Sequence, residues 1–287
     1  MRLRVRSRFE LSMKKRRLSQ IGSFFALSLG SIFQAKWLCL PILHCHSCPI
    51  ASFSCPIGVL GHYLSIGVFP FFLIGTMLLF GALLGRAMCG WVCPFGLLQE
   101  LLHRIPSPKL ELWPPLRFGK YLSLFLLVLA APVLLGTESF LYFCRLCPAA
   151  AIEASLPYAY MQGGFTDFWG PFLRFSILGA VLLASVFVLR FFCRTLCPVG
   201  AITAILNSIS AFSLRHDADA CPQCGECARA CPVGVDLQEE SRSVMYKAPA
   251  DCILCLECTK ACPTSDGLKG SFAGNFRRTD LSGSYKQ

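Results

Sequence analysis

The chain has 287 residues, of which 54% are hydrophobic and 15% charged, and its mean hydropathy is +0.56. These values exclude an ordinary soluble domain and favour segments that cross a membrane. The net charge of +11 does not indicate nucleic-acid binding, because residues 211–287 hold nine Lys/Arg against ten Asp/Glu and the surplus lies in the apolar part. There, basic residues set the orientation of membrane helices.

Four apolar stretches approach the roughly 20 residues that a membrane helix needs. They are Ile21–Leu40, Ser65–Leu84, Lys120–Leu135 and Phe172–Phe192. Eight Lys/Arg precede the first stretch within residues 2–17, as in a signal peptide. That stretch is long for the apolar core of a signal peptide and has no clear cleavage site, so we expect a retained anchor. The sequence therefore predicts an α-helical membrane protein with four transmembrane helices over residues 20–210.

The distribution of basic residues predicts the orientation of these helices. The segment 86–120 carries five Lys/Arg, whereas the segments 36–68 and 139–171 carry one each. Together with the basic N-terminus, residues 1–19, this asymmetry puts both termini and the segment 86–120 on the cytoplasmic side.

A C-terminal domain, residues 211–270, contains two copies of a cysteine pattern typical of bacterial two-cluster ferredoxins. The copies are Cys221-x2-Cys224-x2-Cys227-x3-Cys231-Pro232 and Cys252-x2-Cys255-x2-Cys258-x3-Cys262-Pro263. In this pattern the fourth cysteine binds the cluster of the other copy. We therefore predict one [4Fe–4S] cluster on Cys221, Cys224, Cys227 and Cys262, and another on Cys252, Cys255, Cys258 and Cys231. A zinc site would leave the third cysteine of each copy and the prolines unexplained.

We expect this domain to be a small α+β fold on the cytoplasmic side, followed by a flexible tail over residues 271–287.

The apolar part holds ten more cysteines, and eight of them form pairs that end in Cys-Pro. The pairs are Cys45-x2-Cys48-Pro49, Cys89-x3-Cys93-Pro94, Cys144-x2-Cys147-Pro148 and Cys193-x3-Cys197-Pro198. The order span, Cys-x2-Cys-Pro, span, Cys-x3-Cys-Pro thus occurs twice. It predicts two tandem two-helix repeats related by an axis along the membrane normal.

Such repeats would bring four thiols together at each membrane face, which is the number that one [4Fe–4S] cluster requires. We predict an inner-face cluster on Cys89, Cys93, Cys193 and Cys197. For the outer face we predict a cluster on Cys45, Cys48, Cys144 and Cys147, with Cys55 as an alternative to Cys45. Disulfides or a thiol redox pair are competing interpretations of the outer set.

The remaining cysteine, Cys39, is expected to be simply buried. We expect neither haem, because no Cys-x-x-Cys-His occurs, nor flavin.

The paired cysteine segments followed by two ferredoxin motifs resemble the NapH/MauN family of membrane iron–sulfur proteins over about residues 20–265. The stretch Cys89-Gly90-Trp91-Val92-Cys93-Pro94-Phe95-Gly96-Leu97-Leu98-Gln99-Glu100 is especially similar to a signature of that family. The resemblance implies a multi-pass protein of the bacterial inner membrane. It also implies an electron-transfer subunit of a quinol dehydrogenase-type system, which passes electrons from quinol towards reductases or maturation systems.

The predicted clusters indicate a relay between membrane quinone and a redox partner. That partner could be a periplasmic or membrane-bound reductase or cytochrome, or a cytoplasmic electron donor. A quinol site needs an acid/base group beside an apolar cleft. Glu100 and His103 are the candidates at the inner face and Glu138 at the outer face, and an ordinary interfacial side chain is the alternative for all three. Two other functions compete, an assembly factor supplying electrons to an extracytoplasmic metalloprotein and a transmembrane thiol–disulfide carrier.

Overall fold

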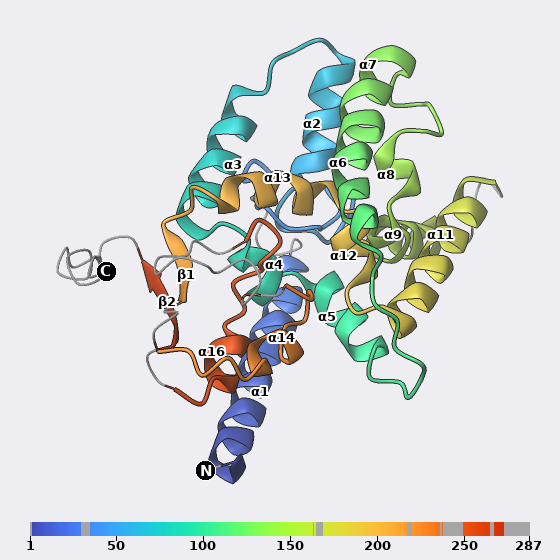
Figure 1. Cartoon of the computed structure of the whole chain (residues 1–287). Coiled ribbons are helices and arrows are strands. Elements are labelled where there is room, and N and C mark those ends of the chain that lie inside the picture. The colour runs from blue at the N-terminus through green and yellow to red at the C-terminus, as the bar shows by residue number, and fades with distance from the viewer. Residues whose placement is uncertain are drawn as a thin grey trace.

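The computed structural model describes residues 2–29, 35–162, 164, 169–216, 220–235, 237, 249–264 and 267–272. Helices dominate these residues. The helices are α1 (Arg2–Leu27), α2 (Pro56–Ser65), α3 (Phe71–Leu84), α4 (Ala87–Trp91), α5 (Pro94–Leu102), η1 (Pro114–Phe118), α6 (Gly119–Ser123), η2 (Leu124–Ala130), α7 (Ala131–Leu135), α8 (Phe143–Leu146), α9 (Pro148–Ala150), η3 (Ala151–Ser155), α10 (Leu156–Gln162), α11 (Trp169–Phe187), α12 (Phe191–Thr195), α13 (Pro198–Asn207), α14 (Glu226–Arg229) and α16 (Glu257–Ala261). Figure 1 shows α2, α3 and α7 at one end of the molecule and α14 and α16 at the other, beside α1.

Two of the four expected spans form as long apolar helices. Residues Pro114–Leu135 make one continuous helix of 22 residues, with a mean hydropathy of 2.0 over its most apolar 18 residues, and Gly170–Phe187 make one of 18 residues with a mean hydropathy of 1.8. Both are long and apolar enough to cross a membrane. The first contains a π-helical segment, Leu124–Ala130. The second ends before the predicted Phe192, because Arg190 adopts a left-handed conformation with φ 53°.

The other two stretches differ from the prediction of four continuous spans. Helix α1 ends at Leu27, and the described residues 35–55 are irregular and fold back, with the Ser52 N–H donating to the Leu27 carbonyl at 2.8 Å. The second stretch is interrupted at Gly67, with φ 71°, and at Pro70. Helix α3 therefore has 14 residues and is about 21 Å long, short of the roughly 30 Å of a bilayer core.

Four helices begin with the same local arrangement, and each of them directly follows one of the cysteines of the apolar part. Helices α2, α5, α9 and α13 each have proline at the first helical position, which suits its fixed φ and missing N–H. The residue before each proline is an extended cysteine. These cysteines are Cys55, Cys93, Cys147 and Cys197. Each thiol is thereby fixed at a helix start.

The C-terminal domain is closed by two strands, β1 (Phe212–His216) and β2 (Leu268–Phe272), which pair antiparallel with Phe212 opposite Phe272. Its core includes Leu214, Ile253 and Leu268, all at most 4% exposed. The expected tail lies almost entirely outside the described residues, which end at residue 272.

Candidate metal centres

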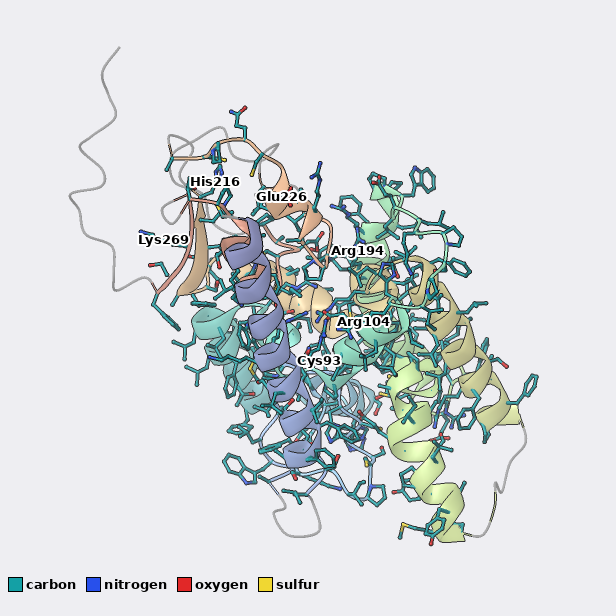
Figure 2. The ribbon with its side chains drawn as sticks, turned by 90° about the horizontal axis from the view of Figure 1, so that it is seen from below. Cys93, Arg104, Arg194, His216, Glu226 and Lys269 are labelled. Carbon is teal, nitrogen blue, oxygen red and sulfur yellow. The ribbon has the colours of Figure 1, made fainter. Side chains whose placement is uncertain are left out.

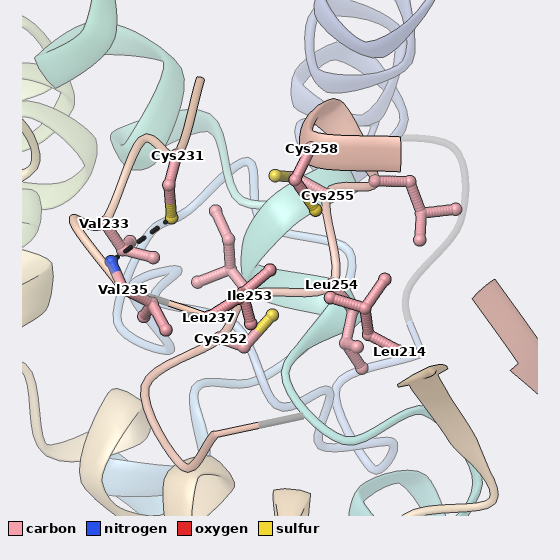
Figure 3. Close-up of a pocket in the computed structure, with 11 residues that line it drawn as sticks. Leu214, Cys231, Val233, Val235, Leu237, Cys252, Ile253, Leu254, Cys255 and Cys258 are labelled. Carbon is pink, nitrogen blue, oxygen red and sulfur yellow. Dashed lines mark hydrogen bonds between the residues drawn. The ribbon is translucent and has the colours of Figure 1, made fainter. Parts of the chain in front are cut away.

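Four cysteines of the C-terminal domain line one cavity, which we call the ferredoxin cavity. They are Cys231, Cys252, Cys255 and Cys258. Figure 3 shows their side chains around the cavity, with Ile253 between them. The Val235 N–H donates to the Cys231 sulfur at 3.4 Å. This is the set that the motif spacing predicted for one [4Fe–4S] cluster.

The backbone of both ferredoxin motifs fits a bound anionic cluster. The residues on either side of the middle cysteine are left-handed in each motif, with φ 51° at Gln223 and 72° at Gly225, and 49° at Leu254 and 59° at Leu256. L-residues rarely adopt this conformation, and consecutive residues that alternate in this way turn their N–H groups towards one concave face, as anion-binding loops do. The loops thus have the backbone that a [4Fe–4S] site requires.

The other predicted set is less fully defined. Burial raises the pKa of Cys227, and the neighbouring Cys221 and Cys224 thiols raise it further. These three cysteines of the first motif therefore lie together. Cys262 packs against the same apolar cluster as Cys227, and its sulfur lies 3.3 Å from the Thr264 hydroxyl.

A second four-cysteine cavity, the inner cavity, lies between the two halves of the apolar part. It is lined by the predicted inner-face set, Cys89, Cys93, Cys193 and Cys197. Figure 2 shows Cys93 in the interior, away from His216 and Glu226 of the C-terminal domain. Burial, followed by the nearby thiols, raises the pKa of Cys197 well above its ordinary value. Four thiolates here would repel one another, so they need compensating positive charge.

Two buried arginines supply such charge at the inner cavity. Arg86 and Arg190 are 2% and 0% exposed, and both line it. Each arginine lies against a glycine of the other half. A Cβ on Gly96 would lie 3.2 Å from the Arg190 guanidinium carbon, and one on Gly200 would lie 3.3 Å from a guanidinium nitrogen of Arg86. The Gly200 N–H also donates to the Cys197 sulfur at 3.4 Å. Thiols, N–H donors and cations fit an anionic thiolate-bound cluster.

A third four-cysteine cavity, the outer cavity, is lined by Cys45, Cys55, Cys144 and Cys147. Three of these belong to the predicted outer set, and Cys55 lines the cavity where Cys48 was predicted. Cys48 and Cys39 do not line this cavity. The difference has a local cause: Cys55 precedes the proline that starts α2, just as Cys147 precedes the proline that starts α9.

The three cavities are adjacent, because single residues line two of them at once. Ile253 lines the ferredoxin cavity and the inner cavity, and Leu43 lines the inner cavity and the outer cavity. Only one layer of side chains therefore separates neighbouring sites. Within the described residues, no three His, Cys, Asp or Glu side chains are grouped so as to hold a single metal ion.

Glu100, predicted as a candidate for quinol chemistry, lies in a buried ion cluster. It accepts hydrogen bonds from Arg16 at 3.0 and 2.7 Å and from Arg190 Nε at 2.7 Å, and Arg16 also pairs with Glu257 at 3.1 Å. Burial acts to raise the pKa of Glu100, but Arg190 and Arg16 outweigh it and lower the pKa. The cluster joins α1, α5 and α16, so the role that this geometry supports is structural.

The other two candidates are placed differently. The Glu138 side chain is 90% exposed and pairs with Arg145 at 2.5 Å. His103 follows α5, and burial, followed by the charge of Lys109, lowers its pKa. Neither residue lines any of the three cysteine cavities.

Sequence reasoning missed Arg86 and Arg190, although a signal for them was present. Each lies three residues before the first cysteine of a pair, so the repeated unit is Arg-x2-Cys-x3-Cys-Pro in both halves. It also missed His44, which is buried and pairs with Glu153 at 3.1 Å.

The C-terminal domain docks on the inner cavity through Gly90. A Cβ there would lie 2.5 Å from the Ile253 carbonyl oxygen, which is backbone and cannot move easily. We expect Gly90→Val to destabilise the protein by about 1–3 kcal/mol through overpacking, measured as a lower unfolding temperature in detergent. Gly75→Val is the matched control, because nothing lies within 4 Å of a Cβ on that helical glycine. Equal effects of the two variants would contradict the docking contact.

Family models match both parts of the chain. Residues 66–112 and 163–215 match a model described as a 4Fe–4S binding domain, and residues 220–266 match one described as a 4Fe–4S dicluster domain. No solved structure matches the chain.

Several curated proteins are similar to the chain. YccM of Escherichia coli strain K12, named as a candidate electron transport protein, is 30% identical over 68% of this chain and 55% of its own length. The methylamine utilization ferredoxin-type protein MauN of Methylobacillus flagellatus is 27% identical over 56% of this chain and 54% of its own length. NirI of Paracoccus denitrificans is 36% identical over 56% of this chain. The chain spans about half the length of YccM and MauN and 23% of NirI. These matches confirm the predicted resemblance.

Proposed function

We propose that this chain, which belongs to the MauN-like family of ferredoxin-type iron–sulfur electron transport proteins, relays electrons between membrane quinone and a redox partner protein through four [4Fe–4S] clusters. The observation that carries the proposal is the row of ferredoxin, inner and outer cavities, each lined by four cysteines and joined through Ile253 and Leu43. Each cluster, when bound, would accept and release one electron at a time. Adjacent centres make such steps short.

The residues that would hold the clusters follow from this arrangement. The ferredoxin motifs would bind two, as their spacing predicts. The inner cavity would bind the third on Cys89, Cys93, Cys193 and Cys197, and the outer cavity would bind the fourth on Cys45, Cys55, Cys144 and Cys147.

The proposal includes a location. The excess of Lys/Arg over residues 2–17 and 86–120 supports a multi-pass protein of the bacterial cytoplasmic membrane, with the C-terminal domain on the cytoplasmic side. The partner would then be a periplasmic or membrane-bound reductase or cytochrome at the outer cluster, or a cytoplasmic electron donor at the ferredoxin domain.

Iron content tests the number of clusters. We expect anaerobically purified protein to contain about 16 iron and about 16 acid-labile sulfide per chain, because each of the four sites holds four of each. Iron and sulfide assays with EPR during a redox titration make the measurement. About 8 iron would restrict clusters to the ferredoxin domain and would favour a thiol–disulfide role for the other cysteines.

Reduction by a quinol analogue tests whether quinol supplies electrons to the clusters. Clusters reduced by decylubiquinol would support the quinone relay. Clusters that decylubiquinol does not reduce, but that accept electrons from a soluble ferredoxin, would instead favour an assembly factor that receives its electrons from the cytoplasm.

A further inference from the structure

An apolar groove lies between α1, α5 and the start of η3, and no cysteine lines it. It offers about 330 Å³ of space and is open to the surface along Phe24 and Phe25, which are 41% and 63% exposed. This volume falls within the range of small-molecule sites, which is roughly 300–1,000 Å³. Its size and apolar walls suit a flat ring that carries an apolar tail.

One carboxylate lies in this otherwise apolar lining. Glu153 has a side chain only 10% exposed, and its Oε2 lies 3.1 Å from His44 Nδ1 and accepts the Cys45 N–H at 2.6 Å. Both contacts use Oε2, so the carboxylate is fixed in orientation. A fixed acceptor in an apolar cleft is the arrangement that holds a ligand hydroxyl by a charge-assisted hydrogen bond.

The groove also borders both membrane-part cavities. Phe95 lines the groove and the inner cavity, and Ala149 lines the groove and the outer cavity. A ring bound here would be one side chain away from either proposed cluster. A lipid acyl chain could fill the apolar volume, but it has no hydroxyl to donate to the carboxylate.

We propose that this groove is the binding site for the head group of a membrane quinol, with a ring hydroxyl donating to Glu153 and the apolar tail leaving along Phe24 and Phe25. The inference rests on the quinone relay proposed above and gives it a location. It moves the site away from Glu100, His103 and Glu138.

Filling the groove with a larger side chain tests whether quinol binds there. We expect Leu98→Trp, which puts a large ring into the groove, to weaken binding of decylubiquinol to the full-length protein in detergent by more than about tenfold. Glu153→Gln, which keeps the shape and removes the charge, is expected to weaken it by about threefold to tenfold. In Leu98→Trp, the iron content and the EPR spectrum after dithionite reduction should match the unaltered protein, which shows that the clusters are intact.

The matched control is Ile205→Trp, placed in a second apolar cavity of about 190 Å³ that no cysteine and no charged residue lines. It should bind decylubiquinol normally. Loss of binding in Ile205→Trp with normal binding in Leu98→Trp and Glu153→Gln would overturn the groove while leaving the quinone relay standing. If the unaltered protein neither binds decylubiquinol nor is reduced by it, although dithionite reduces its clusters, the relay itself fails and the groove assignment fails with it.

Discussion

Cys55→Ala is expected to remove about four of the roughly sixteen iron atoms per chain, because it deletes one of the four thiols of the outer cavity. The remaining three cysteines, Cys45, Cys144 and Cys147, would leave one corner of a cubane cluster without its ligand. The measurement is iron and acid-labile sulfide on anaerobically purified protein. EPR should lose one set of signals and keep those of the ferredoxin motifs.

Cys48→Ala is the matched control for this experiment. Cys48 is as buried as Cys55, at 2% and 7% exposure, and carries the same side chain, but it does not line the outer cavity. Its replacement should therefore leave the iron content unchanged. Iron lost from Cys48→Ala and retained in Cys55→Ala would restore the ligand set predicted from the sequence and contradict the geometry of the cavity.

The ferredoxin motifs and the inner cysteines could be predicted because their spacing is itself the constraint. Three cysteines within seven residues converge through local backbone alone, and Cys89-x3-Cys93-Pro94 and Cys193-x3-Cys197-Pro198 are identical in spacing. Local geometry and the repeat then specify the same four thiols at the inner cavity, with no knowledge of how the helices pack.

The outer set could not be predicted in full because the repeat is unequal there. Cys144 and Cys147 are three residues apart, whereas Cys45 and Cys55 are ten apart and are joined by an irregular loop. The closer spacing of Cys45 and Cys48 favoured Cys48, which does not line the cavity. The common feature was the extended cysteine before a helix-starting proline, which Cys55 shares with Cys93, Cys147 and Cys197.

The acid/base candidates differ from the structure for a different reason. Hydropathy can place Glu100 near a membrane face, but it cannot show that Arg16 and Arg190 reach it from positions 84 and 90 residues away. Ion pairs between distant segments depend on packing. For the same reason the sequence did not indicate the pair of Glu153 and His44. These residues are 109 positions apart in the sequence, but Glu153 Oε2 lies 3.1 Å from His44 Nδ1 in the structure.

The buried ion cluster predicts a large loss of stability in Glu100→Gln. Glu100 is the carboxylate shared by Arg16 and Arg190, which are 2% and 0% exposed. Its neutralisation leaves two buried guanidinium groups with Glu257 as the remaining carboxylate of the cluster, and breaking such a pair typically costs about 3–5 kcal/mol. We expect a lower unfolding temperature in detergent, followed by circular dichroism, and looser packing of α1 on α5.

A double-mutant cycle shows whether that loss is electrostatic. If the cost of Glu100→Gln comes from uncompensated positive charge, adding Arg16→Met should recover part of the stability, so that the double variant unfolds at a higher temperature than the sum of the single effects predicts. Additive losses would mean that Glu100 acts through packing alone. Glu138→Gln serves as the control, because its carboxylate is 90% exposed and surface ion pairs contribute little. We assign the buried cluster as a contact that holds the ferredoxin domain, α1 and the inner cavity together. A fall in unfolding temperature as large in Glu138→Gln as in Glu100→Gln would contradict this assignment.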